Sequence, residues 1–227
     1  MDTIRVEDTL VLIPALNEGT NVGRIVSAVR KLGFPVLVID DGSSDNTSQA
    51  ARDAGATILR FSENRGKGAA IRHGFGYFLS ENYPAIILMD SDGQHDPLEL
   101  LVFLKNLNEG SMFVVGSRME RATGMPWLRV ATNRLMSWLL SFVADQRIPD
   151  TQCGYRALRR EVVRDFSLST TRYEIESEML LQAAQKRYRV DSIPIRCVYE
   201  GGKSQIHPWR DTARFVRFLA RHIFKKP

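Results

Sequence analysis

The sequence predicts an α/β fold in which one doubly wound, mostly parallel β-sheet is flanked by helices. Short, continuously apolar segments at 10–14 and 36–40 have the composition of strands that are covered on both faces. Further strand-like segments lie at 56–61, 85–89 and 112–116. Helix-like segments separate them. This alternation is typical of doubly wound domains, in which ligands bind beyond the carboxyl ends of the strands.

The helices of the first half fill the gaps between these strands, at 21–32, 45–54, 67–79 and 98–107. In the first of them an apolar face at the spacing of an amphipathic helix is formed by Val22, Ile25, Val26 and Val29. Ser44 or Asp45 is suited to cap the second helix, because both side chains accept hydrogen bonds from N-terminal backbone N–H groups.

The regular alternation ends after the last of these strands. A helix is predicted over 127–143, where a polar stripe recurs every four residues and consists of Arg129, Asn133, Ser137 and Ser141. A second helix is predicted over 173–184, and its Glu176 and Glu178 are interpreted as a solvated face or as partners of nearby arginines. An extended segment is predicted at 191–199.

Length and composition indicate one domain. The chain has 227 residues, enough for one sizeable core, and its composition marks no linker or internal repeat, so a single domain over 1–227 is expected. The N-terminal residues lack the apolar stretch of a secretory signal, and no segment approaches the roughly 18 apolar residues of a membrane span. Cys153 and Cys197 match no zinc or redox spacing, so reduced thiols in a cytoplasmic protein are expected.

Positive charge is concentrated at the C-terminus. The net charge is +5, and 208–227 holds six basic residues and one aspartate. On a helix, an arc of about 60° would contain Arg210, Arg214, Arg217 and Arg221. Such a basic amphipathic helix over 208–227 can lie in a membrane interface, and a helix docked on the domain is the alternative. A nucleic-acid partner is disfavoured, because these basic residues gather on one short helix without a nucleic-acid-binding motif.

Two carboxylates follow the predicted strand at 85–89. Asp90 and Asp92 lie two residues apart, so on an extended chain they point the same way. A turn at Gly93 can add the amide oxygen of Gln94. Such a cluster of hard oxygen atoms suits Mg²⁺ or Mn²⁺ that carries substrate phosphates. Ordinary turn and N-cap chemistry is the alternative interpretation of the same residues.

Two familiar nucleotide-binding motifs are absent. The first strand ends in Pro-Ala-Leu-Asn-Glu at 14–18, which is not the glycine-rich turn of dinucleotide-binding domains. Arg-Gly-Lys-Gly at 65–68 lacks the spacing of a Walker loop. Lys67 on this glycine loop can contact a phosphate or a ribose, and a solvated lysine is the alternative. Asp40 and Asp41, at the end of the second strand, are suited to accept hydrogen bonds from a base or a ribose.

Five motifs follow one another along the chain, at 14–18, 38–47, 65–68, 90–95 and 116–118. In this order they resemble the motifs of family 2 glycosyltransferases with the GT-A fold, and most of all those of dolichol- and polyprenyl-phosphate sugar synthases. The resemblance continues through 150–158 and 201–204. It implies a GT-A fold with amphipathic helices on the acceptor side and at the C-terminus.

The resemblance also implies roles for individual residues. The donor is expected to bind against Pro14, Leu16, Glu18, Asp41, Lys67, Asp90 and Ser91. A divalent metal ion is expected to bind Asp90, Asp92 and Gln94. The acceptor phosphate is expected to bind against Arg118, Arg129, Asn133 and Lys203. The expected catalytic residues are Asp92, Arg118 and Arg129.

Two positions depart from the family pattern. Asn133 stands where the family has a serine, and it keeps a hydrogen-bonding group. In the late loop the related synthases carry arginine and lysine, whereas this chain offers Lys203, with Gln205 as the other candidate.

The implied function is an inverting, metal-dependent hexose transfer. The donor would be a nucleotide diphosphate sugar of the GDP-mannose or UDP-glucose type, and the acceptor dolichyl or polyprenyl phosphate at the cytoplasmic face of a membrane. A phosphate acceptor is already ionised near neutral pH, so it needs cations such as Arg118, Arg129 and Arg156 more than a general base. A hydroxyl acceptor, with Glu176 or Glu178 as base, is one alternative, and a non-catalytic nucleotide-sugar sensor is another. A second copy of the chain or a membrane protein as partner is left open.

Overall fold

The computed structural model describes residues 3–119 and 127–196, and for 127–129 it describes the backbone alone. Several predictions fall outside the described residues, namely the helix over 208–227, the end of the extended segment at 197–199, and Cys197, Lys203 and Gln205.

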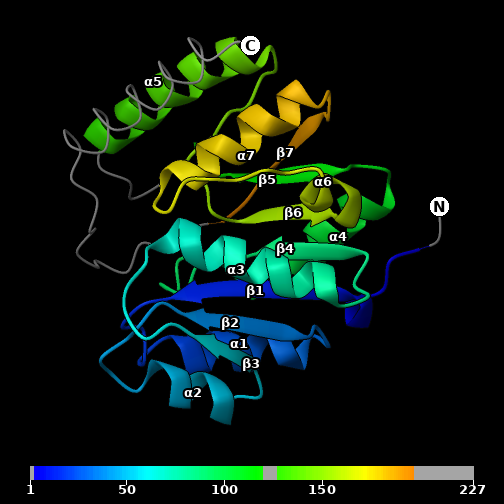
Figure 1. The fold of residues 1–227 in the computed structure, drawn as a ribbon. Coiled ribbons are helices and arrows are strands. Elements are labelled where there is room, and N and C mark those ends of the chain that lie inside the picture. The colour runs from blue at the N-terminus through cyan, green and yellow to red at the C-terminus, as the bar shows by residue number, and fades with distance from the viewer. Residues whose placement is uncertain (1–2, 120–126, 197–227) are drawn as a thin grey trace.

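Within the described residues a seven-stranded sheet forms the centre of the protein, in the order β3-β2-β1-β4-β6-β5-β7 (Figure 1). Its strands are β1 (Thr9–Ala15), β2 (Val36–Asp40), β3 (Thr57–Arg60), β4 (Ala85–Leu88), β5 (Phe113–Ser117), β6 (Arg156–Arg159) and β7 (Val190–Pro194). Neighbouring strands pair in parallel except β6, which runs antiparallel to both β4 and β5. The predicted α/β fold on one mostly parallel sheet is confirmed.

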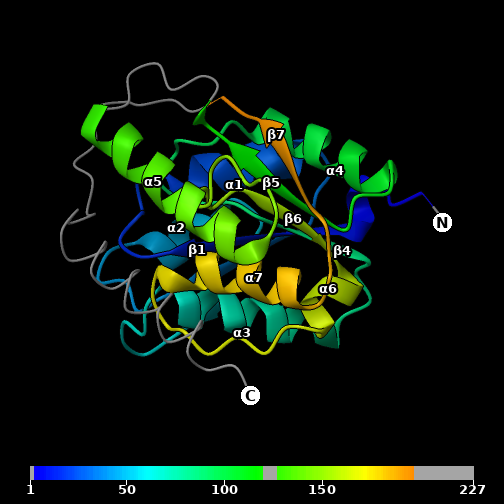
Figure 2. The ribbon, with the colours of Figure 1, turned by 90° about the horizontal axis from the view of Figure 1, so that it is seen from above.

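Helices cover both faces of the sheet (Figure 2). They are α1 (Val22–Lys31), α2 (Thr47–Asp53), α3 (Lys67–Ser80), α4 (Leu100–Asn108), α5 (Trp127–Ala144), α6 (Arg160–Arg164) and α7 (Glu174–Gln185), with short 3₁₀ turns η1 (Val6–Asp8) and η2 (Pro97–Glu99). α1 and α4 lie on one face, and α3, α6 and α7 lie on the other. α5 packs against α7 at one end of the sheet.

β6 is missing from the strands that the sequence predicts, because Arg-Ala-Leu-Arg contains no apolar run. All four of its residues are nevertheless buried. The guanidinium of Arg159, for example, donates to the backbone carbonyl of Leu107 at 2.6 Å. The antiparallel direction of β6 sets Arg156 opposite Leu88 at the end of β4. The loop at 150–155 therefore arrives at the same edge of the sheet as the carboxyl ends of the parallel strands.

The apolar residues of the central strands form the core. Every residue of β1, β2, β4, β5 and β6 is buried, whereas β3 at the edge of the sheet is partly exposed. Cys153 lies in this core, and burial raises the pKa of its thiol to about 12. In the part of the chain that the structure describes, no helix is long and apolar enough to cross a membrane.

Candidate active site

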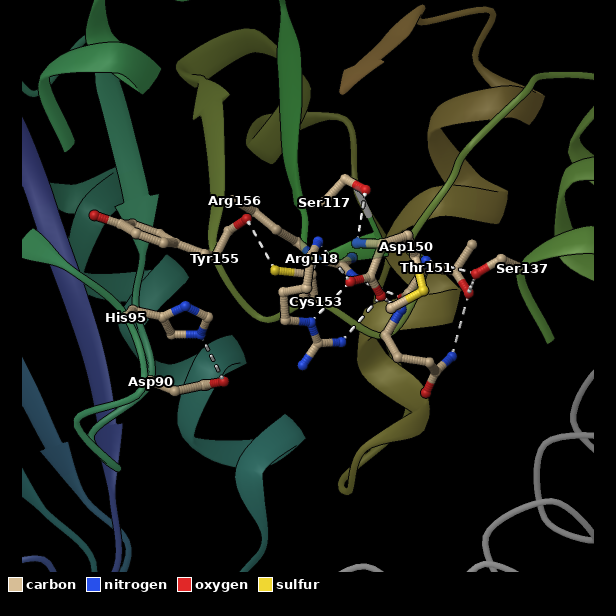
Figure 3. Close-up of polar contacts among 12 residues, drawn as sticks. Asp90, His95, Ser117, Arg118, Ser137, Asp150, Thr151, Cys153, Tyr155 and Arg156 are labelled. Atoms are coloured by element: carbon tan, nitrogen blue, oxygen red, sulfur yellow. Dashed lines mark hydrogen bonds and ion pairs between the residues drawn. The ribbon is translucent and has the colours of Figure 1, made fainter. Parts of the chain in front are cut away.

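Polar and charged side chains gather at the carboxyl edge of the sheet, where a doubly wound topology places its ligand site. They come from the segments that follow β1, β2, β4 and β5, and from the loop at 150–155 that leads into β6. Figure 3 shows those that follow β4 and β5 together with the loop at 150–155. The helices α3, α5 and α7 supply the remaining side chains.

The segment after β1 is tied to the segment after β2 by hydrogen bonds. The backbone N–H of Asn17 donates to Ser43 Oγ at 2.9 Å, and Asn17 Oδ1 accepts from the backbone N–H of Ser44 at 2.9 Å. Asn17 has a φ of 55°, a left-handed conformation that asparagine adopts more readily than most residues. The backbone N–H of Glu18 donates to Thr47 Oγ1 at 2.8 Å. The two segments that carry predicted donor-binding residues thus form one wall, and Asn17, which the sequence did not single out, joins them.

The two aspartates at the end of β2 accept hydrogen bonds from other groups of the protein. Asp40 is fully buried and accepts a hydrogen bond from the hydroxyl of Ser48, which does not fit the predicted contact with a base or ribose. Asp41 accepts from the backbone N–H groups of Arg65 and Gly66 at 2.7 and 2.8 Å. Asp41 therefore fixes the glycine loop that precedes α3.

The acidic turn after β4 differs from the geometry that the sequence predicts. β4 ends at Leu88, so Asp90 and Asp92 do not lie on one extended strand. Asp90 contacts buried groups, whereas Asp92 is exposed. Gly93 turns the chain with a φ of 77°, and the Asp92 carboxylate accepts from the backbone N–H of Gln94 at 3.0 Å. The described residues contain no cluster of three or more His, Cys, Asp or Glu side chains arranged to hold a metal ion.

The chemistry of this turn still fits a divalent ion of the magnesium type. Mg²⁺ is usually held by one or two carboxylates together with substrate phosphates and waters, and not by an all-protein cage. Asp92 presents an exposed carboxylate, and the Asp90 side chain is 24% exposed. Between them, the Ser91 hydroxyl donates to the carbonyl of Pro14 at 3.0 Å and so fixes the turn against β1. Two hard carboxylates on a fixed turn suit Mg²⁺ or Mn²⁺.

Glu18 adds negative charge beside this turn. Its carboxylate accepts from the side-chain amide of Asn21 at 3.0 Å. Burial raises the pKa of Glu18, the hydrogen bond from Asn21 opposes this effect, and the carboxylates of Asp92 and Asp45 raise the pKa further. Leu16, another predicted donor contact, is half-buried in the same segment. The accumulated carboxylates favour a cation at this edge of the site.

Lys67 lies between two carboxylates, which excludes the alternative interpretation of it as a solvated lysine. Its Nζ is 2.6 Å from Asp90 Oδ1 and 2.6 Å from Glu176 Oε1. Burial lowers the pKa of Lys67, but the two carboxylates raise it more, and the ammonium stays charged. Burial raises the pKa of Asp90, but Lys67 and His95 together bring it well below its usual range. The sequence contains no local sign of this bridge, because Glu176 follows more than 100 residues later.

The two glutamates of α7 are buried, which corrects the interpretation of this helix face as solvated. Glu176 and Glu178 are 5% and 4% exposed. The partner of Glu176 is a lysine, where the sequence suggested an arginine. Glu178 accepts hydrogen bonds from the backbone N–H groups and the hydroxyls of Ser169 and Thr170. It thereby closes the turn that precedes α7.

His95 and Gly154 enclose the other side of Asp90. The Nε2 atom of His95 is 3.4 Å from Asp90 Oδ2, and its ring lies 4.8 Å from that of Tyr155 (Figure 3). A Cβ atom at Gly154 would lie 2.4 Å from Asp90 Oδ2. A residue larger than glycine would therefore displace the carboxylate. Neither residue has an individual role in the sequence analysis, although both lie in motifs that it identifies.

Arg118, a predicted catalytic and acceptor-binding residue, is held by a buried aspartate. Its Nε and Nη2 donate to the two carboxylate oxygens of Asp150 at 2.7 and 3.0 Å, and its backbone N–H donates to the same carboxylate at 3.1 Å (Figure 3). Arg118 is 6% exposed and Asp150 is 0% exposed. Such a bidentate pair fixes the plane of the guanidinium. The role of Asp150 is not readable from the sequence, where it is one residue of a longer motif.

The sequence suggested that Arg156 belongs to a phosphate-binding surface. The structure does not agree with this suggestion. It is fully buried and donates to the backbone carbonyls of Thr151, Cys153 and Glu176 at 2.9, 2.8 and 2.5 Å. Burial lowers the pKa of Arg156, and the carboxylate of Glu176 opposes this effect. The guanidinium thus joins the loop before β6 to α7.

The described polar residues of the stripe on α5, Asn133, Ser137 and Ser141, face the rest of the protein. Ser137 Oγ accepts from the backbone N–H of Thr151 at 3.0 Å. Asn133, one turn earlier, is 7% exposed, and its Nδ2 has no hydrogen-bond partner among the described residues. A buried N–H group of this kind is costly unless a ligand or water satisfies it. The side chain of Arg129 lies outside the described residues.

Several large apolar side chains of α5 point outward, whereas Met136 and Leu140 pack in the core. Leu135, Trp138 and Phe142 are 55%, 65% and 79% exposed. The rings of Trp138 and Phe142 stack with their centroids 6.4 Å apart. Large exposed apolar groups along one helix mark a surface that contacts another apolar surface.

Three comparisons with known proteins agree with this architecture. The sequence model of glycosyl transferase family 2 matches residues 10–166. Polyprenol monophosphomannose synthase of Mycolicibacterium smegmatis is 31% identical over 201 residues, which cover 82% of this chain and 76% of that protein. Dolichyl-phosphate hexose transferase of Haloferax volcanii is 30% identical over 219 residues, which cover 95% of this chain and 93% of that protein.

A solved structure of similar fold contains a metal ion and a nucleotide. Glucosyl-3-phosphoglycerate synthase from Mycobacterium tuberculosis, in complex with Mn²⁺, uridine diphosphate and phosphoglyceric acid, matches with a TM-score of 0.68. The sequences are 19% identical, and the match covers 92% of this chain and 74% of that one. At this level of identity the similarity concerns the fold.

Proposed function

The chain belongs to glycosyltransferase family 2 and is a glycosyltransferase, and on this premise we propose that it transfers a hexose to a polyprenyl or dolichyl phosphate. The donor is a nucleotide diphosphate sugar, and the anomeric carbon is inverted. The names of the two relatives, a polyprenol monophosphomannose synthase and a dolichyl-phosphate hexose transferase, support this acceptor class.

The buried carboxylates near the acceptor side are already paired, and this observation carries the choice of acceptor. Asp150 is paired with Arg118. Glu176 is paired with Lys67, and Glu178, the other candidate base, accepts hydrogen bonds from Ser169 and Thr170. A hydroxyl acceptor needs a carboxylate or a similar base to take its proton, whereas a phosphate monoester is ionised near neutral pH. The pairing therefore supports a phosphate acceptor over a sugar or protein hydroxyl.

On the donor side, the nucleoside diphosphate gains negative charge as its bond to the sugar breaks. A divalent ion bound by Asp92, Gln94 and Asp90 would neutralise that charge as a Lewis acid. Lys67 places a buried ammonium beside Asp90 and adds a fixed positive charge to this region. The wall formed by the segments after β1 and β2, with Pro14, Leu16 and Glu18, is the proposed surface for the nucleoside, and Asp41 supports it by holding the adjacent glycine loop.

On the acceptor side, Arg118 and Asn133 are the proposed contacts of the lipid phosphate. Asp150 holds the guanidinium of Arg118 in one plane, so the cation is oriented before the acceptor binds. The buried Nδ2 of Asn133 has no partner among the described residues, and a phosphate oxygen would satisfy it. Arg129 and Lys203 complete the proposed phosphate site.

The exposed apolar face of α5 is the proposed contact for the lipid chain and the membrane surface. Leu135, Trp138 and Phe142 project from the same helix that carries Asn133. Asn133 lies on the inward face of this helix, so α5 would stand between the phosphate site and the apolar groups that it presents outward. The basic segment at 208–227 would add attraction to anionic lipids. We propose that the enzyme acts at the cytoplasmic face of a membrane.

The test measures release of nucleoside diphosphate from a panel of UDP- and GDP-hexoses, with and without polyprenyl phosphate. One donor is expected to give release that depends on the lipid phosphate and stops in EDTA. Asp92→Ala is expected to abolish release. Full turnover in EDTA, or full turnover of the Asp92 variant, contradicts the proposed role of the metal ion. Release that is indifferent to the lipid phosphate contradicts the proposed acceptor.

A further inference from the structure

The Lys67 ammonium joins the two halves of the site. Asp90 belongs to the turn after β4 on the donor side, and Glu176 belongs to α7 on the other side. The two carboxylates approach the same Nζ at 2.6 Å each, and the three side chains are 18%, 24% and 6% exposed for Lys67, Asp90 and Glu176. One cation is therefore shared between a carboxylate that is proposed to bind metal and one that is not.

The competition for Asp90 has a physical consequence. A divalent cation at Asp90 would bind the same carboxylate that Lys67 already contacts, and the cation would repel the Lys67 ammonium. Lys67 must then weaken its contact with Asp90. If Asp90 were its only carboxylate partner, Lys67 would oppose metal binding. Weakening its contact with Asp90 would then leave a buried ammonium without a partner.

From this arrangement, and resting on the proposed metal-dependent function, we infer that Glu176 is a positioning residue that retains Lys67 while Asp90 binds a divalent cation. Glu176 keeps the buried ammonium paired as its contact with Asp90 weakens. It therefore lowers the free-energy cost of metal binding. It also keeps a positive charge beside the departing diphosphate.

The backbone around Lys67 and Glu176 is held independently of the ion pair. The backbone N–H of Ala69 donates to the Thr171 carbonyl at 3.1 Å. A Cβ at Gly68 would lie 2.7 Å from the carbonyl carbon of Thr171, so the glycine loop packs directly on this turn. The carbonyl of Glu176 accepts from the buried Arg156 at 2.5 Å. Replacing the Glu176 carboxylate therefore changes the partner of Lys67 while these backbone contacts remain.

Glu178 provides a matched control on the same helix. It is 4% exposed, close to the 5% of Glu176, and its carboxylate accepts from Ser169 and Thr170. Glu176→Gln and Glu178→Gln each replace one buried carboxylate of α7 by an amide of the same size. A general effect of losing buried charge would appear in both variants, whereas an effect through Lys67 would appear in the first.

The experiment measures the dissociation constant of Mn²⁺ alone, from the electron paramagnetic resonance signal of the free ion. Glu176→Gln is expected to weaken Mn²⁺ binding at least tenfold, and Glu178→Gln to change it less than twofold. Lys67→Met is expected to tighten Mn²⁺ binding, because the competing ammonium is gone. In the Lys67→Met background, Glu176→Gln is expected to have less than a twofold effect.

Several outcomes would overturn the inference. Unchanged Mn²⁺ affinity in Glu176→Gln would do so, and so would an equally large effect of Glu176→Gln with and without Lys67. If Glu176→Gln fails to fold, unchanged affinity in Lys67→Met overturns it independently.

Asp90→Asn separates the two proposals. If that variant loses Mn²⁺ while Glu176→Gln does not, the inference alone is wrong. If Asp90→Asn and Asp92→Ala both leave Mn²⁺ binding unchanged, the proposed metal site is wrong as well.

Discussion

Replacement of Asp150 by asparagine should make the protein easier to unfold and should reduce hexose transfer. The Asp150 carboxylate is fully buried and accepts three hydrogen bonds from Arg118. Asp150→Asn keeps the size of the side chain but removes its charge, and it sets an NH₂ group against the donors of Arg118. Breaking a buried pair by removing one partner costs about 3–5 kcal/mol, since the remaining charge is buried without a counter-charge.

This magnitude is large enough to measure by thermal and urea unfolding. For a chain of this size, each kcal/mol lowers the melting temperature by about 2–4 °C, so a loss of roughly 6–20 °C is expected. Glu109→Gln is the matched control, because Glu109 and Lys105 form a pair in which both side chains are mostly exposed, at 60% and 72%. Exposed pairs contribute little, and no measurable change is expected there.

Activity gives a second measure of the same variant. Asp150 orients Arg118, so the Michaelis constant for the lipid phosphate should rise in Asp150→Asn more than that for the donor. An Asp150→Asn protein that unfolds like the unmodified chain and keeps its affinity for the lipid acceptor would refute the assigned role of this pair.

Three further predictions follow from other parts of the site. Gly66→Ala should cost about 1–3 kcal/mol of unfolding free energy, because Gly66 has a φ of 95° and a Cβ there would lie 2.4 Å from the Thr171 carbonyl oxygen. Gly76→Ala, within α3, meets no atom within 4 Å and should be neutral or stabilising, and equal losses in the two urea titrations would contradict this reasoning. Trp138→Ser combined with Phe142→Ser should reduce co-sedimentation with anionic liposomes without changing the melting temperature, since both side chains are mostly exposed; unchanged sedimentation would remove α5 from the proposed membrane contact. Folding lowers the pKa of Asp90 below that of an unfolded aspartate, about 3.9, so its contribution to stability is present above that pH and is lost as the pH falls toward the folded value. Asp90→Asn should therefore flatten the decline of stability between about pH 5 and pH 2, and an unchanged acid profile would count against this ion pair.

The strands that the sequence predicts are those with an apolar run. The run at 10–14 corresponds to β1, and the run at 36–40 corresponds to β2, because a strand covered on both faces must be apolar at every position. β6 carries no such signal. Its arginines are buried through hydrogen bonds to backbone carbonyls. These include the carbonyls of Glu176 and Leu107, which are distant in the sequence, so such partners become visible only when the chain is folded.

In the candidate site too, contacts between residues distant in the sequence could not be predicted. The motifs correctly indicate which segments meet at the edge of the sheet, because the carboxyl ends of parallel strands lie together. They do not indicate how charges are paired within it. Lys67 and Glu176 are distant in the sequence, and Glu176 lies in a helix whose spacing alone suggests a solvated face. The early end of β4 at Leu88 likewise changes the directions of the aspartates that follow it.

The most direct test of the proposed function compares two acceptors that differ by one phosphate group. The purified chain is incubated with a labelled nucleotide hexose that it accepts, with Mn²⁺, and with either polyprenyl phosphate or the corresponding free polyprenol. Label is expected in the phosphate lipid and not in the alcohol, because the buried carboxylates near the acceptor side are paired with cations. Efficient labelling of the free alcohol, or none of the phosphate lipid, would contradict the proposed transfer to a lipid phosphate.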